Sequence, residues 1–108
     1  MKKLILLFFF TALFQQDIIA QEVSKRVMIV YGSDECYHCI DTKVYLKKNK
    51  IDFIFFDIDK NADALNEMLS KLKNAGISSS NLGIPVIDKQ GLIFTNNGVF
   101  EEFLKKLN

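Results

Sequence analysis

Two cysteines separated by two residues, Cys36-Tyr37-His38-Cys39, are the strongest chemical signal in this sequence. They are the only cysteines of the chain, and they follow a short apolar run that ends in a Gly-Ser-Asp-Glu turn. Two intervening residues on one helical turn let the second sulfur reach the first. Such a pair can exchange a disulfide with another molecule through a mixed-disulfide intermediate. We expect Cys36 to be the attacking thiol and Cys39 the resolving thiol.

The place of the pair at the predicted start of a helix matters more than its spacing. A helix N-terminus has free N–H groups and about half a positive charge. Both favour a thiolate, and such sites lower the pKa of a cysteine from about 8.5 to roughly 3.5–7.5. A cationic His38 would add to this effect and make the pair more oxidising, whereas Asp34 and Glu35 oppose it. The expected balance favours an ionised Cys36, with His38 as a third catalytic residue.

Other interpretations of the cysteine pair stay open. An inert structural disulfide would close too short a ring to stabilise the fold by much. Zinc takes four ligands, and one chain offers only Cys36, His38 and Cys39; we assign no metal ligand. A dimer could pool two pairs around zinc or an iron–sulfur cluster, so a metal- or cluster-binding module is the alternative function. A non-catalytic secreted binding domain is a further alternative.

Length and composition exclude several classes of protein. The chain has 108 residues, of which 49% are hydrophobic and 25% charged, and its formal net charge is +1. This length allows one domain. The balanced charge gives no sign of a nucleic-acid partner. A single histidine excludes a multi-histidine metal site within one chain.

The first twenty residues have the layout of a secretory signal peptide. A positively charged start precedes an uncharged apolar run over residues 4–14, and polar residues 15–17 follow. This run is too short for a stable membrane span, which needs about 20 apolar residues. We predict a signal peptide over residues 1–20, cleaved after Ala20, and a mature domain over residues 21–108 in the periplasm or outside the cell. A buried N-terminal helix and an uncleaved anchor are the alternatives.

Hydrophobic periodicity predicts seven elements in the rest of the chain. Apolar, β-branched runs predict strands over residues 26–31, 51–58, 84–87 and 92–94. Helical spacing predicts helices over residues 36–50, 61–75 and 100–107. A hairpin turn at residues 88–91 joins the last two strands. The order gives a parallel βαβ unit and then a ββα unit, so we predict an α/β fold with a four-stranded mixed sheet and helices on both faces.

Side-chain patterns within these elements give finer expectations. Ile40 and Val44 share one face of the first helix, for which Ser33 and Asp34 are suitable N-caps. The opposite face is a solvated cluster of Lys43, Lys47, Lys48 and Lys50. The acids at the end of the second strand, Asp57 and Asp59, are expected to cap the next helix. Six aromatic residues are expected in the core: Phe53, Phe55, Phe56, Phe94, Phe100 and Phe103.

The cysteine motif after the first strand and Ile84-Pro85 before the third resemble the thioredoxin superfamily, and within it a glutaredoxin. The resemblance covers residues 27–107 and implies the thioredoxin fold. It implies a cis peptide bond at Pro85 that faces the active-site disulfide. It also implies that the backbone of Ile84 receives an incoming peptide or glutathione thiol. Asn97-Gly98, with Glu101 three residues on, matches the place where glutaredoxins hold glutathione.

The chain departs from the glutaredoxin pattern at its active site. Acidic Asp34 and Glu35 stand where many glutaredoxins carry a lysine nearby, and Tyr37 replaces the usual proline as an exposed aromatic beside the disulfide. His38 before Cys39 resembles the protein disulfide isomerases and periplasmic disulfide oxidases. We therefore predict an exported, monomeric thiol–disulfide oxidoreductase. Its partners are protein disulfides or dithiols, it needs no metal or organic cofactor, and glutathione is a candidate co-substrate.

Overall fold

The computed structural model describes residues 27–108. Its elements follow the predicted order: β1 (Met28–Gly32), α2 (Tyr37–Lys48), β2 (Phe53–Asp57), α3 (Ala62–Asn74), β3 (Val86–Lys89), β4 (Leu92–Thr95) and α4 (Phe100–Lys105). The predicted signal peptide lies outside the described residues. Within residues 27–108, no helix has the length and apolar character needed to cross a bilayer.

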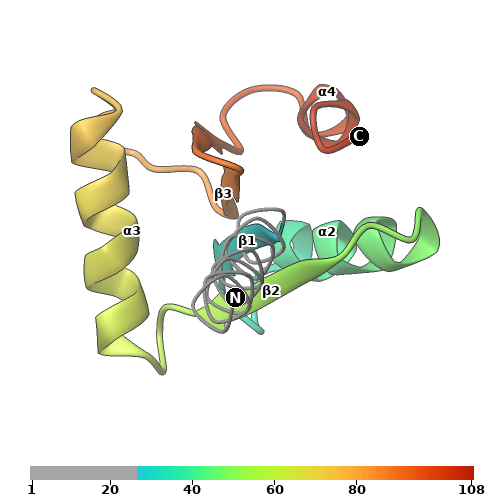
Figure 1. The fold of residues 1–108 in the computed structure, drawn as a ribbon, viewed down its shortest axis with the longest axis horizontal. Helices are drawn as coiled ribbons and strands as arrows, with labels where there is room; N and C mark the ends of the chain where they lie inside the picture. The colour runs from blue at the N-terminus through green and yellow to red at the C-terminus, as the bar shows by residue number, and fades with distance from the viewer. Residues whose placement is uncertain (1–26) are drawn as a thin grey trace, which may run out of the picture.

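The four strands form one mixed sheet in the order β2-β1-β3-β4, which confirms the predicted α/β arrangement (Figure 1). β1 is parallel to β2, as a βαβ unit requires, and β3 is antiparallel to both β1 and β4. Gly32, the last residue of β1, is paired with Asp57, the last residue of β2. The loops that follow these two strands therefore start side by side at one edge of the sheet.

Helices cover both faces of the sheet, with α3 on one face and α2 and α4 on the other (Figure 1). Alternate strand residues face opposite layers. Val30 and Ile87 pack with the α2–α4 layer, whereas Tyr31 and Val86 pack with α3. A fully buried aliphatic side chain contributes about 1.5–3 kcal/mol to stability. These two half-cores hold the central strands, and with them the cysteine loop, in place.

The hairpin turn is shorter than predicted, because it begins two residues later and ends at the same residue. Asp88 and Lys89 belong to β3, where they pair with Ile93 and Leu92. The turn consists of Gln90 and Gly91, whose φ angles are 54° and 94°. Two successive positive φ angles are typical of the type I′ turn, whose twist matches that of the flanking strands. Residues 84 and 85 precede β3 because proline has no N–H to donate to a ladder.

The buried face of α2 is not the one that its apolar residues predict. Val44 is 59% exposed and Ile40 is also exposed, whereas Cys39, Thr42 and Leu46 are fully buried. Thr42 tolerates burial because its hydroxyl donates to the His38 carbonyl at 2.6 Å. The expectation that Ile40 and Val44 face the core was therefore wrong.

The predicted aromatic core is confirmed only in part. Phe103 is fully buried and packs with the α2–α4 layer. The other five phenylalanines are half-buried and surround the two half-cores: Phe53, Phe55, Phe56, Phe94 and Phe100.

Candidate active site

Cys36 is the N-cap of α2, a place that the sequence analysis had given to Ser33 or Asp34. Its backbone is extended, with φ −93° and ψ 121°, and its Sγ accepts a hydrogen bond from the Cys39 N–H at 3.4 Å. An N-cap side chain lies against the unpaired N–H groups of the first turn. The sulfur of Cys36 is half-buried, so solvent and a substrate can still reach it.

Cys39 has the opposite surroundings. It is fully buried, and its Sγ accepts a hydrogen bond from the Ser33 N–H at 3.4 Å. Burial and, after it, the hydrogen bond with Cys36 together raise the pKa of Cys39 to about 12. The two sulfurs of the motif thus differ in access, with the more accessible one at the tip of the helix.

Gly32 makes room for the buried thiol at the end of β1. A Cβ on this residue would lie 2.6 Å from the Cys39 Sγ and 3.1 Å from the ring of Phe55. No side chain fits that space without moving its neighbours. The glycine of the Gly-Ser-Asp-Glu turn therefore sets how closely the sulfur of Cys39 approaches the sheet.

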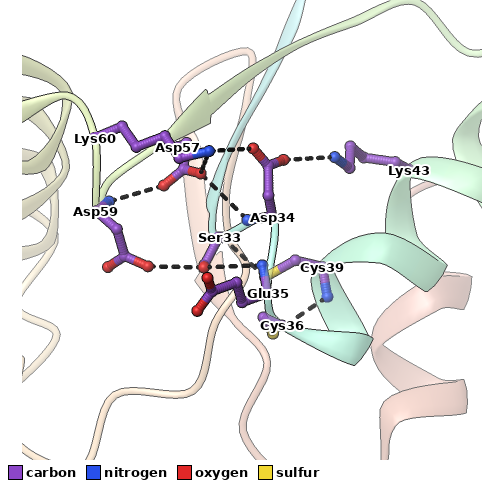
Figure 2. Close-up of polar contacts among 9 residues, drawn as sticks. All are labelled: Ser33, Asp34, Glu35, Cys36, Cys39, Lys43, Asp57, Asp59 and Lys60. Atoms are coloured by element: carbon purple, nitrogen blue, oxygen red, sulfur yellow. Dashed lines mark hydrogen bonds and ion pairs between the residues drawn. The ribbon is translucent and has the colours of Figure 1, made fainter.

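The loop between β1 and Cys36 is fastened to the loop that follows β2 (Figure 2). The Ser33 hydroxyl donates to Asp59 at 2.7 Å and accepts from the Glu35 N–H at 3.2 Å. The carboxylate of Asp57 accepts from the N–H groups of Asp34 at 3.3 Å and Asp59 at 2.9 Å. These contacts fix the backbone that leads into the cysteine motif.

The acids of this second loop do not cap α3, as the sequence analysis had expected. Asn61 is the N-cap of that helix, and its side-chain oxygen accepts from the Ala64 N–H at 3.0 Å. Asp57 and Asp59 instead accept hydrogen bonds from the loop between β1 and Cys36. Pairing of Gly32 with Asp57 across the sheet explains the difference, because it brings both loops to the same edge.

Lys43 belongs to the site, although the sequence analysis placed it on a solvated helix face. Its ammonium lies 3.2 Å from the Asp34 carboxylate (Figure 2). The same ammonium lies 4.0 Å from the centre of the Phe55 ring. The Lys43 ammonium lowers the pKa of the Asp34 carboxyl. Lys60 lies 3.4 Å from the other oxygen of Asp34. Nothing in the spacing of Asp34 and Lys43 along the chain indicates this pair.

The Ile84–Pro85 peptide bond is cis, as the resemblance implied, and Pro85 is buried. Its loop is joined to α2 through Asn96, a residue that the sequence analysis did not single out. The Asn96 amide nitrogen lies 3.1 Å from the Ile84 carbonyl oxygen and 3.0 Å from Nδ1 of His38. One carboxamide thus links the cis-proline loop to the cysteine motif. The sequence signal that could have indicated Asn96 is the Asn-Asn-Gly run directly after the last strand.

The two residues between the cysteines lie at the surface. The ring of His38 stacks on Phe100 of α4, with centroids 4.3 Å apart and planes 19° apart. It contacts both α4 and Asn96. The expected effect of His38 on the Cys36 thiol stays a prediction. Tyr37 is 84% exposed, in line with the expected aromatic surface beside the motif.

Asn97, Gly98 and Glu101 lie on the segment that leads from β4 into α4. The Asn97 side-chain oxygen accepts from the Gly83 N–H at 3.0 Å, so this residue borders the cis-proline loop. Gly98 has a φ of 93°, a conformation that glycine adopts at low cost. Glu101 is exposed in the first turn of α4. Their part in holding glutathione stays a prediction.

Comparison with known proteins agrees with this geometry. The Glutaredoxin family model matches residues 28–87, which is more than half of the chain. The chain belongs to the glutaredoxin family. The match spans β1, the cysteine motif, the cis proline and the start of β3. No curated protein matches this glutaredoxin in sequence.

Solved structures give this glutaredoxin the thioredoxin fold. Glutaredoxin Grx-1 from Archaeoglobus fulgidus is similar at 28% identity and a TM-score of 0.55, covering 74% of this chain and 83% of its own. The thioredoxin-like protein BC3987 is similar at 26% identity and a TM-score of 0.55, covering 75% of this chain and 99% of its own. The predicted fold and family are confirmed, and both support chemistry of the thiol–disulfide oxidoreductase type.

Among residues 27–108, no group of three or more His, Cys, Asp or Glu side chains is placed to hold a metal ion.

Proposed function

We propose that this protein is an exported thiol–disulfide oxidoreductase that acts on protein disulfides or dithiols, with glutathione as a candidate co-substrate. One observation carries the proposal: half-buried Cys36 caps the helix and accepts a hydrogen bond from the N–H of Cys39, whose buried thiol has a pKa raised to about 12. This asymmetry supports attack by Cys36 and resolution by Cys39.

The first step forms a mixed disulfide. The Cys36 thiolate attacks one sulfur of a substrate disulfide, the substrate S–S bond breaks, and the other substrate sulfur leaves as a thiolate. That leaving thiolate takes the proton of Cys39. Since the hydrogen bond and charge of Cys36 help to raise the pKa of Cys39, binding Cys36 into a disulfide makes this proton easier to remove.

The second step closes the cycle within the protein. The Cys39 thiolate attacks Cys36 Sγ, the mixed disulfide breaks, and the second substrate sulfur leaves as a thiolate. Two electrons have then passed from the Cys36–Cys39 dithiol to the substrate, and the protein holds the new disulfide. The same steps run backwards when the protein acts as an oxidant.

Reduction of insulin disulfides by a dithiol reductant tests the assignment. Cys36→Ser should lose all exchange activity, and Cys39→Ser should accumulate a mixed disulfide with the substrate. Cys36→Ser combined with Ser79→Cys is the matched control, because it restores an exposed thiol in a remote loop. Full activity in Cys36→Ser would overturn the proposed function, and so would recovery in the control.

Two further measurements test the rest of the proposal. Fractionation of cells that express the full chain, followed by N-terminal sequencing, should find the mature protein outside the cytosol and beginning at Gln21. Retention of residues 1–20 on a cytosolic product would overturn export. Zinc at half an equivalent or more per chain, or a visible absorption band in the reduced protein, would favour a metal- or cluster-binding module instead.

A further inference from the structure

Asn96 makes four contacts across the gap between the cis-proline loop and α2. Its backbone N–H donates to the carbonyls of Gly83 and Pro85, each at 3.2 Å. Its side-chain nitrogen donates to the Ile84 carbonyl at 3.1 Å and lies 3.0 Å from Nδ1 of His38. Every residue of the segment 83–85 is thus held by this one asparagine.

The contact with Ile84 fixes the direction of the other bond. A carbonyl oxygen only accepts, so the group that faces it must be the NH₂ of the carboxamide. The second hydrogen of that NH₂ then points at His38, whose Nδ1 must accept it. The ring proton of a neutral His38 therefore lies on Nε2. Stacking of the same ring on Phe100 fixes its plane.

Asparagine is suited to this place by its chemistry. Two donors on one atom are needed, one for the Ile84 carbonyl and one for the imidazole, and a primary amide supplies both. Aspartate has the same shape but no donor, and serine or threonine has only one. The oxygen of the same amide, Asn96 Oδ1, is buried without a partner among the described residues. Burying an unpaired amide oxygen is unfavourable, so the donor contacts must offset this cost.

The backbone of Gly83 packs closely against Asn96 and Asn97. A Cβ on Gly83 would lie 1.9 Å from the Asn96 carbonyl oxygen and 2.6 Å from the Asn97 side-chain oxygen. Asn96, the residue after β4, therefore packs directly against the loop that carries the cis proline. A displacement of Asn96 would move Ile84 and His38 together.

We propose that Asn96 is a positioning residue for disulfide exchange. It holds the Ile84 carbonyl and the His38 ring with one NH₂ group, and so fixes the cis-proline loop against the helix turn that carries Cys36. The inference rests on the proposed function, because the positioned groups are those that receive a protein substrate. Substrate binding should depend on Asn96, whereas the intrinsic reactivity of the Cys36 thiol should not.

Two variants test this role, with a matched control. Asn96→Leu keeps the approximate size, removes both donors and also removes the orphaned oxygen. Asn96→Asp keeps the shape and replaces the donors by acceptors. Asn74→Asp makes the same chemical change at the exposed end of α3, on the other face of the sheet.

Kinetics provide the first measurement. With insulin as substrate, Asn96→Leu should raise KM about fivefold, the effect of roughly one hydrogen bond, with kcat within about twofold of the wild type. The rate at which iodoacetamide alkylates Cys36 should stay within about twofold, because this small reagent does not use the loop. A wild-type KM in both variants, or an equal rise in Asn74→Asp, would overturn the proposal.

Nitrogen NMR of the His38 ring provides the second measurement, which does not depend on activity. In the wild type, Nδ1 should have the shift of an unprotonated nitrogen and Nε2 that of a protonated one. In Asn96→Asp, the proton should move to Nδ1, which then donates to the new carboxylate. A wild-type ring protonated on Nδ1, or a spectrum unchanged in Asn96→Asp, would overturn the proposal. If the wild type had no exchange activity, the proposed function would fail while this spectrum still reported on Asn96.

Discussion

The difference between the two thiols originates in single residues at the end of β1. Cys36 caps the helix and stays half-buried, whereas Cys39 lies under the Ser33 N–H and beside the bare backbone of Gly32. The chemistry needs this difference, because a resolving thiol that is also exposed would compete for the substrate.

Alkylation of the reduced protein at pH 8 should modify Cys36 long before Cys39. Raising a pKa from 9.0 to about 12 lowers the thiolate fraction about a thousandfold, and burial adds a steric barrier. Peptide mapping by mass spectrometry after a timed dose of iodoacetamide measures the two rates. In a denaturant the two rates should become similar, which serves as the control. Comparable labelling of both cysteines in the native protein would contradict the assigned roles.

Gly32→Ala should lower the free energy of unfolding by about 1–3 kcal/mol, because its Cβ would overlap the Cys39 sulfur. Urea denaturation of the reduced protein measures this loss. The same substitution in a Cys39→Ala background should be less costly, since the sulfur 2.6 Å away is gone while the Phe55 ring remains. Equal losses in both backgrounds would mean that the clash lies elsewhere.

At the scale of elements, α2 shows how packing overrides the apolar pattern of a helix. The side chains that face the sheet are Cys39, Thr42 and Leu46, because the helix must present Cys39 to Gly32. Two hydrophobic residues, Ile40 and Val44, are left exposed as a result. The helix on the other face, α3, is joined to the sheet by a salt bridge of 2.7 Å between Lys71 and Asp88.

Truncating one residue on each face of α2 should lower the free energy of unfolding by different amounts. Leu46 is 0% exposed, so Leu46→Ala should lower the free energy of unfolding by about 2–5 kcal/mol. Val44 is 59% exposed, so Val44→Ala should change it by less than about 0.5 kcal/mol. Urea denaturation of both variants gives the comparison. A large loss in Val44→Ala would contradict the assignment of this side chain to the exposed face of α2.

At the scale of the whole molecule, the sheet brings three loops to one edge. The loops after β1 and β2 meet there because those strands are parallel, and the segment before β3 arrives there because β3 runs antiparallel to β1. Groups whose pKa values are raised lie on both sides of this sheet. Burial raises the pKa of Cys39 on one side and that of Tyr31 on the other, each to about 12.

These shifts predict that the reduced protein loses stability in alkali. The unfolded chain releases the protons of Cys39 and Tyr31 near pH 9 and 10, whereas the folded chain keeps them to about pH 12. The unfolded state therefore binds fewer protons in this range, and stability falls as the pH rises through it. The loss approaches about 1.4 kcal/mol for each unit of raised pKa.

Urea denaturation between pH 8 and pH 11 measures this dependence. The slope should be smaller in Tyr31→Phe, which has no phenol to ionise. It should also be smaller in the oxidised protein, whose Cys39 has no proton to lose. Stability that stays constant or rises across this range in the reduced wild type would contradict the prediction.

The sequence by itself determined the order of elements, the family and the identity of the paired thiols. These follow from local information, because period-2 and helical patterns, a Gly-Ser-Asp-Glu turn and a Cys-x-x-Cys spacing are all read within a few residues. The family resemblance, not a local pattern, predicted the cis bond at Pro85 that the structure contains. Only the tertiary structure decided that Cys36 itself caps α2, that Lys43 pairs with Asp34, and that Asn96 joins His38 to Ile84.

The physical reason is the distance along the chain between partners. Asn96 and His38 are 58 residues apart, and Ser33 and Asp59 are 26 apart. Such pairs meet only after the strands take their register, which is set by burial of the two half-cores and not by the polar residues themselves. A local pattern can place a cysteine at the start of a helix. The groups that surround its sulfur come from distant segments, which strand pairing in the sheet brings together.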